Sequence, residues 1–135
     1  MEGLPSWERG TPGVLCVAGP HAIPVSTAIR ASGDRLLLAL GAGRGTLGRL
    51  RQDPGAAFCL LGAGVAFTAE GQARVVAERL DAAPVAAVEL RVERVQDHLA
   101  DGRTELLDGA RWRRTEQRYS ESDAAIDAEL SRLAG

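Results

Sequence analysis

The sequence predicts a mainly β domain in which six antiparallel strands form a barrel or a sandwich. Within the 135 residues, short apolar or alternating runs are separated by Gly, Pro and Asp at close intervals, as is typical of strands and turns. Residues 88–93, VELRVE, alternate between apolar and charged side chains, so one face packs on a core and the other meets water. A chain of this length predicts a single domain.

The apolar runs set the bounds of the expected strands, which span residues 13–18, 22–31, 35–40, 56–62, 66–77 and 85–97. Gly71 lies inside the fifth run, and the alternation of the sixth slips at Arg94 and Val95, so bulges are expected to bend both strands. Pro24 predicts a free edge or a bulge in the second strand, because proline offers no N–H to a ladder. A free edge there leaves backbone groups available to a ligand.

Two helices are expected. Residues 46–52 begin with Thr46, a capping-type hydroxyl, and stop before Asp53 and Pro54, with Leu47 and Leu50 facing the sheet.

The second helix is expected to start at the sequence SESD, residues 120–123, which resembles a capping box. It places Ile126, Leu130 and Leu133 on one stripe, which docks on the barrel or on a partner subunit. Residues 5–9 can form a short turn of helix.

Composition excludes several classes of function. The net charge is -2, whereas a nucleic-acid-binding protein needs an excess of positive charge. All 16 basic residues are arginines, which excludes chemistry in which a lysine forms a Schiff base. The uncharged apolar run at residues 54–69 contains three glycines and is too short for a membrane helix. The first residues lack the features of a signal peptide, so a cytoplasmic protein is expected.

Cysteine and histidine predict no metal site. Cys16 and Cys59 lie in apolar runs without a CxxC spacing and are expected to be buried free thiols. His21 and His98 lack companion ligands at metal-site spacing, and their roles stay open. His21, Ser26 and Asp34 do not form a recognisable triad, so no catalytic residue is identified.

Two segments could bind an anion. Residues 36–47, LLLALGAGRGTL, lead from a strand through a glycine-rich loop into a helix start, where Arg44 and free amides can hold a phosphate. Thr46 stands where a dinucleotide fingerprint needs glycine, and a plain surface loop fits the pattern equally well. Residues 111–114, RWRR, can grip a phosphate or a flat ring, or can be a solvated run anchored by its tryptophan.

The chain resembles the pyridoxamine 5'-phosphate oxidase-like family of flavin-binding split barrels, particularly its short single-domain members. The resemblance covers about residues 7–98 and is carried, in order, by GVLCVAG, GPHAIPVSTAIRASGD, RLLLALGAGRGTLGRLRQDP, AAFCLLG and FTAEGQARVV. It implies a six-stranded antiparallel split β-barrel with short flanking helices and a C-terminal helix. Residues 1–135 then form a single domain, with a barrel core at about 13–98 and a C-terminal segment and helix at about 99–135.

The resemblance further implies a homodimer that binds FMN, or a deazaflavin coenzyme, in clefts between the subunits, and that acts as an oxidoreductase on a small organic substrate. The positions that match the family's cofactor-binding residues are Val25, Ser26, Thr27, Ala28, Leu40, Gly41, Arg44, Gly45, Thr46 and Arg49. The first four are expected against the isoalloxazine ring and ribityl chain and the next five near the ribityl phosphate, with Arg49 a weaker candidate.

The sequence departs from the family pattern in ways that affect phosphate binding. Thr46 occupies the usual lysine position, and Pro24 and Ile29 occupy strand positions that are often basic. Arg111 or Arg113 of the partner subunit can supply the missing charge. The C-terminal segment lacks the substrate-binding region of true pyridoxamine phosphate oxidases, so that activity is not expected. The alternatives are a non-catalytic dimeric protein that binds or senses a flavin or haem, and a scaffold that binds nothing.

Overall fold

The computed structural model describes residues 3–43 and 45–135. Across these residues the chain forms, in order, β1 (Gly13–Val17), β2 (His21–Val25), β3 (Ile29–Ser32), β4 (Arg35–Gly41), α1 (Gly45–Gln52), β5 (Gly55–Gly62), β6 (Val65–Ala77), β7 (Val85–Asp97) and α2 (Gln117–Ala134). The mainly β prediction is confirmed. Residues 5–9, expected as a short helical turn, are not helical.

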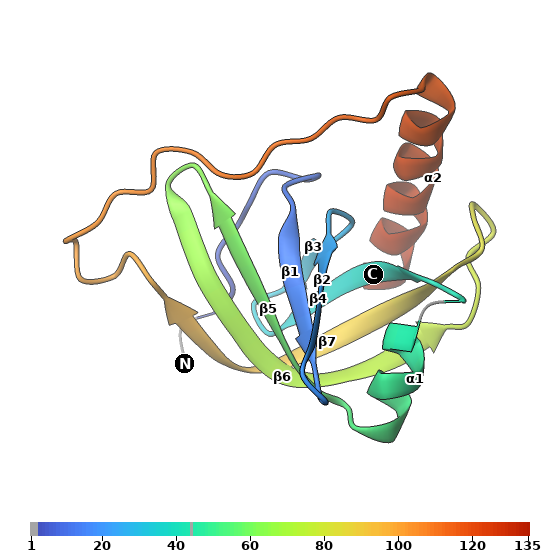
Figure 1. Cartoon of the computed structure of the whole chain (residues 1–135), viewed down its shortest axis with the longest axis horizontal. Helices are drawn as coiled ribbons and strands as arrows, with labels where there is room; N and C mark the ends of the chain where they lie inside the picture. Colours follow the sequence, from blue (N-terminus) through green and yellow to red (C-terminus); the bar gives the residue numbers. More distant parts are fainter. Residues whose placement is uncertain (1–2, 44) are drawn as a thin grey trace.

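The strands form one antiparallel sheet in the order β2-β1-β5-β6-β7-β4-β3, which curls around a core (Figure 1). The predicted second strand, residues 22–31, is wrong as a single element, because β2 pairs with β1 whereas β3 pairs with β4. The described residues therefore contain seven strands, with β2 and β3 at opposite ends of the sheet. No ladder joins these two ends in the described part of the chain, so the sheet is open.

Pro24 lies on an end strand, which confirms the free edge that the sequence predicts. An end strand can accommodate a proline, because it pairs on one side only.

The two predicted bends meet at one place in the sheet. Glu70 pairs with Arg94 and Gly71 with Val92, so Glu93 is an extra residue on β7 and forms a bulge just before the predicted position. A Cβ on Gly71 would lie 1.9 Å from the Arg91 carbonyl oxygen. This close approach of two backbones explains why the position is glycine.

The concave face of the sheet holds the main hydrophobic core. Phe58 and Phe67 are buried there, and the Trp7 ring packs against both, with centroid distances of 6.5 and 5.3 Å. Helix α1 contributes Leu47 and Leu50 to this core, as predicted.

Helix α2 packs on the outer face of the sheet beside β3 and β4, so its docking surface is its own sheet (Figure 1). It begins at Gln117, three residues before the predicted start, and its N-cap Glu116 makes no side-chain capping bond. Ile126 and Leu130 are buried as predicted, but the stripe continues to Ala134, and Leu133 is 42% exposed.

Between β7 and α2, residues 98–116 run across the molecule without helix or strand, and we call them the strap (Figure 1). The amide of Gly64 donates to the Leu106 carbonyl at 2.9 Å, which fastens the strap to the β5–β6 hairpin. Gly109 lies so close to this hairpin that a Cβ would be 2.1 Å from the Leu61 carbonyl oxygen. The strap is therefore packed closely against the hairpin at this point.

Both thiols are free, but the expectation that they are buried is wrong: Cys16 is exposed and Cys59 is half-buried. Alternate residues of β1 face opposite sides, and Leu15 rather than Cys16 faces the core. Within the described residues, no helix combines the length and the hydropathy that a membrane crossing requires.

Candidate functional site

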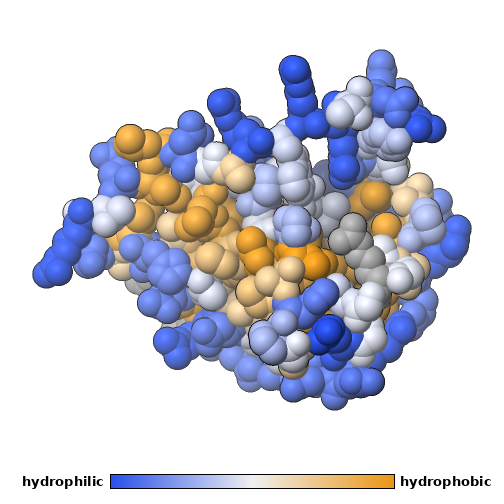
Figure 2. Space-filling view, viewed as in Figure 1, coloured by the Kyte–Doolittle hydropathy of each residue, from blue (hydrophilic) through white to orange (hydrophobic). Residues whose placement is uncertain are grey.

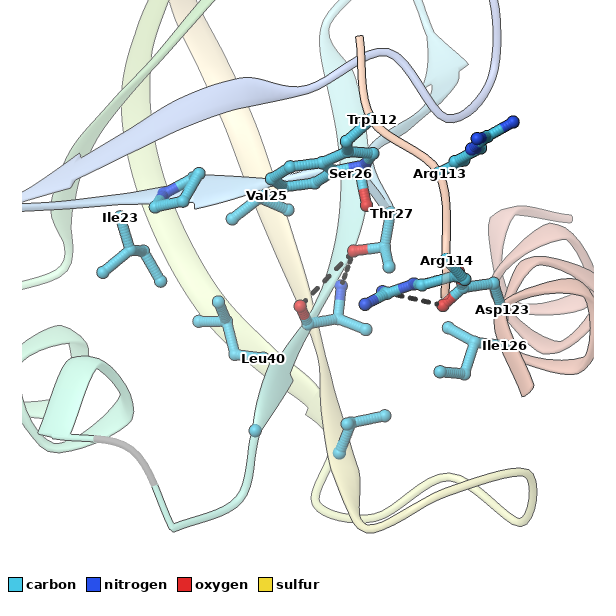
Figure 3. Close-up of a pocket in the computed structure, with 14 residues that line it drawn as sticks. Ile23, Val25, Ser26, Thr27, Leu40, Trp112, Arg113, Arg114, Asp123 and Ile126 are labelled. Atoms are coloured by element: carbon cyan, nitrogen blue, oxygen red, sulfur yellow. Dashed lines mark hydrogen bonds and ion pairs between the residues drawn. The ribbon is translucent and has the colours of Figure 1, made fainter. Parts of the chain in front are cut away.

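A cleft of about 460 Å³ lies where the two ends of the sheet approach each other. Strand β2 forms one wall and the end of β4 the other, while the strap and α2 close the remaining side (Figure 3). Its apolar walls come from Ile23, Val25, Leu40, Val85 and Ile126. The volume and the apolar lining are those of a small-molecule site.

Thr27 ties the two walls together. Its Oγ1 accepts a hydrogen bond from the Ala39 amide at 2.9 Å and lies 3.4 Å from the Ala39 carbonyl oxygen, to which it donates (Figure 3). The Thr27 side chain thus makes the hydrogen bonds to β4 that the backbone of a longer β3 would make.

The backbone of Gly41 faces the cleft. Alternate residues of a strand direct their N–H and C=O groups to opposite sides, so Gly41 points the same way as Ala39. Ala42 points the other way, and its amide donates to the Pro84 carbonyl at 3.2 Å. Gly41 therefore offers a donor and an acceptor to a ligand in the cleft.

The structure brings five of the predicted cofactor-binding residues together in the cleft lining: Val25, Ser26, Thr27, Leu40 and Gly41. Ala28 is not among them, because it is 2% exposed and its carbonyl accepts the Trp7 indole N–H at 3.1 Å.

The predicted residues of α1 are placed outside the cleft lining. Thr46 is 1% exposed, and its hydroxyl lies 3.0 Å from His21 Nε2. Arg49 donates to the Gly19 carbonyl at 2.8 Å. Gly45 is exposed at the start of α1, and Arg44 lies outside the described residues.

The strap contributes Trp112, Arg113 and Arg114 to the cleft of its own chain. Trp112 is 52% exposed, and its ring lies beside the end of β2, next to Ser26 (Figure 3). The expected role of Arg113 is at the partner's site, whereas here it lines the same chain's cleft. Arg111 does not line this cleft.

Arg114 joins the strap to α2. It forms two hydrogen bonds with Asp123, at 2.7 and 3.1 Å, and this pairing raises the pKa of Arg114 above its ordinary value. Asp123, Val85 and Ile126 were not predicted as lining residues, because they come from elements that meet β2 only in the folded chain. In the sequence, the opposite charges of Arg114 and Asp123 on either side of the start of α2 could have indicated that these two side chains pair.

The described lining of the cleft holds few ionisable side chains. Among its described lining residues there is no His, Cys, Met, Tyr or Lys, and its carboxylate, Asp123, is paired with Arg114. The described residues also contain no group of three His, Cys, Asp or Glu that could hold a metal ion.

No protein-family model matches the chain, and no curated protein matches it. Its fold is nevertheless found in solved structures. A Listeria innocua protein provisionally assigned as a pyridoxamine 5'-phosphate oxidase has a TM-score of 0.54 and 15% identity, over 65% of this chain and 88% of that one. An F420 reductase has a TM-score of 0.55 and 12% identity, over 66% of this chain and 91% of that one.

A heme binding protein from Mycobacterium smegmatis has a TM-score of 0.54 and 18% identity, over 66% of this chain and 49% of that one. These structures confirm the predicted likeness to pyridoxamine 5'-phosphate oxidase-like proteins at the level of the fold. The names of these structures point to different cofactors, so the shared fold does not identify a cofactor for this chain.

Proposed function

We propose that the protein binds FMN or a deazaflavin coenzyme in the cleft between β2 and β4 and acts with it as an oxidoreductase on a small organic substrate. The observation that carries this proposal is the shape and lining of the cleft, with apolar walls, an exposed indole and backbone polar groups. A flat ring system with polar edges fits such a lining, because its faces meet apolar side chains and its edges meet hydrogen-bonding groups.

Four of the lining residues have specific roles in this proposal. Val25 and Leu40 contact the faces of the ring, Trp112 stacks on it, and the Gly41 backbone hydrogen-bonds to its edge. The bound cofactor supplies hydride transfer, while the chain orients it and keeps water away.

The ribityl phosphate is proposed to lie toward residues 44–46, where the chain leaves Gly41 and enters α1. The first amides of α1 lack partners within the helix and favour an anion, and Arg44 adds a charge. Since the Thr46 hydroxyl lies against His21, its amide rather than its side chain would contact the phosphate.

The likeness to an F420 reductase supports the deazaflavin form of the proposal, because F420 is a deazaflavin coenzyme. The likeness to a heme binding protein raises a second candidate, a non-catalytic dimeric protein that binds or senses a flavin or haem. Haem iron is held by His, Cys, Met or Tyr side chains, and none of these lies in the described lining of the cleft. The lining therefore favours a flavin over haem.

We further propose a homodimer that associates through the outer face of β1 and β5. Val14 and Leu61 are 41% and 50% exposed there, and Val14 pairs with Cys59 in the register. Figure 2 shows hydrophobic residues gathered over this part of the sheet and over the β5–β6 hairpin. The exposure of these apolar side chains supports the proposed interface.

Titration of the purified protein with FMN, riboflavin and F420, followed by flavin fluorescence and absorption, tests the proposal. We expect saturable binding of FMN or F420 and weaker binding of riboflavin, which lacks the phosphate. The S26F variant, which places a phenyl ring in the cleft, should abolish binding, whereas L133A on the exposed side of α2 should bind normally.

The variant R44A tests the phosphate end separately. It should remove the preference for FMN over riboflavin and leave riboflavin binding unchanged. Failure of the wild-type protein to bind both FMN and F420 would overturn the proposed function.

A further inference from the structure

The loop between β6 and β7, residues 78–84, ends at the cleft. It contains no helix or strand and leads directly into Val85, which lines the cleft. The Ala42 amide donates to the Pro84 carbonyl at 3.2 Å, and Gly41 pairs with Val85 in the ladder between β4 and β7. The position of this end of the loop therefore sets the position of the Gly41 backbone.

Helix α2 holds the middle of the loop through one carboxylate. Glu129 accepts hydrogen bonds from two consecutive backbone amides, from Asp81 to Oε2 at 3.0 Å and from Ala82 to Oε1. Among the described residues, these two are the hydrogen bonds that join α2 to the loop. Leu80, which precedes them, is buried in the same apolar cluster as Leu130, and Figure 1 shows the loop beside α2.

The other polar contact that ties the side chains of this loop to a helix is weaker. Glu78 pairs with Arg51 of α1, but these side chains are 75% and 51% exposed. An ion pair in water contributes little to stability, whereas hydrogen bonds from backbone amides to a charged carboxylate are among the stronger ones. The contact with Glu129 is therefore the one expected to keep the loop in place.

We propose that Glu129 is a positioning residue of the cofactor site. By holding the β6–β7 loop on α2, it keeps Val85 and the Gly41 backbone where they meet the ring of the bound cofactor. The role in cofactor binding rests on the proposed function, whereas the effect on Gly41 does not. Glu129 does not line the cleft and acts only through the loop. Asp123 holds the strap from the same helix, so α2 clamps two borders of the cleft.

The variant E129Q tests this proposal in the cofactor-free protein. A glutamine has one acceptor oxygen, and its NH₂ group would face a backbone N–H, so one of the two hydrogen bonds is lost together with the charge. Amide hydrogen exchange of Ala42 and Asp81 should become faster by about tenfold, as the loss of a hydrogen bond to a charged group allows. E121Q is the matched control, because Glu121 accepts a hydrogen bond from Gln117 of its own helix.

Titration of the same variants with FMN and riboflavin tests the consequence for the cofactor. E129Q should weaken the binding of both ligands by the same factor, up to about tenfold, because the ring end of the site is displaced in part of the molecules. A contact that only stabilised the fold would lower the unfolding midpoint and leave both dissociation constants unchanged.

Unchanged exchange of Ala42 in E129Q, or equal effects of E121Q and E129Q, would overturn the proposal. Faster exchange with unchanged affinity for both ligands would refute the role in cofactor binding. If the wild-type protein binds neither FMN nor F420, the proposed function fails, and the exchange of Ala42 still decides whether Glu129 positions the Gly41 backbone.

Discussion

Arg114 and Asp123 form a bidentate ion pair that fixes the strap to α2, with Nε 2.7 Å from Oδ2 and Nη2 3.1 Å from Oδ1. Both side chains line the cleft. The contact therefore holds one wall of the cleft in place.

The first prediction concerns this pair. D123N should free the strap while costing only about 0–1 kcal/mol of unfolding free energy, because both side chains are partly exposed. Amide hydrogen exchange of residues 110–114 should become faster, and FMN should dissociate more rapidly. E116Q, which disturbs the exposed pair of Glu116 with Arg118, is the control. Equal exchange in the two variants would show that the pair does not hold the strap.

The second prediction concerns a buried carboxylate on β7. Glu89 is 2% exposed and accepts hydrogen bonds from Arg35 Nε at 2.9 Å and Arg74 Nε at 3.1 Å. Burial alone would raise its pKa, but the hydrogen bonds and charges of the two arginines outweigh burial and lower the pKa below its ordinary value. At neutral pH, E89Q should destabilise the fold by about 1–3 kcal/mol, because the arginines lose their charged acceptor.

The pH dependence of this effect follows from the direction of the shift. A lowered pKa in the folded state means that the carboxylate stabilises the fold above its unfolded-state pKa, and that this stabilisation disappears as the pH falls through the folded-state pKa. Urea unfolding from pH 7 into the acid range should therefore show the gap between wild type and E89Q closing. E93Q, on an exposed side chain of the same strand, should show a small gap throughout, and a constant E89Q gap would contradict the explanation.

The third prediction compares two glycines. G71A should destabilise the protein by about 2 kcal/mol or more, because its Cβ meets the Arg91 carbonyl and the bulge must rearrange. G48A should instead stabilise it by about 0.5–1 kcal/mol, since a Cβ there meets no atom within 4 Å and alanine favours helix α1. Thermal unfolding of both variants provides the measurement. Similar shifts in the two melting temperatures would refute the close-approach argument.

The fourth prediction tests the proposed dimer. V14R places a charge on the outer face of β1 without touching the core, so it should convert a dimer to a monomer in light scattering. L133R makes the same kind of change on exposed α2 and should leave the mass unchanged. A wild-type monomer, or a V14R variant that still dimerises, would exclude this face as the interface.

The sequence by itself determined the features that depend on local pattern. Alternation placed most of the strands, Gly71 marked the bend, and Pro24 marked a free edge, because each of these reports how neighbouring residues in the chain can pair and turn. The resemblance to a known family likewise placed five residues that the structure brings into the cleft.

The tertiary structure alone decided which strands meet. Residues 22–31 read as one strand, yet they supply both ends of the sheet, because pairing with β1 or with β4 depends on residues distant in the chain. Asp123 lies inside α2 rather than at its start, and its side chain pairs with Arg114. The cleft depends on these same long-range contacts, which no short window of sequence contains.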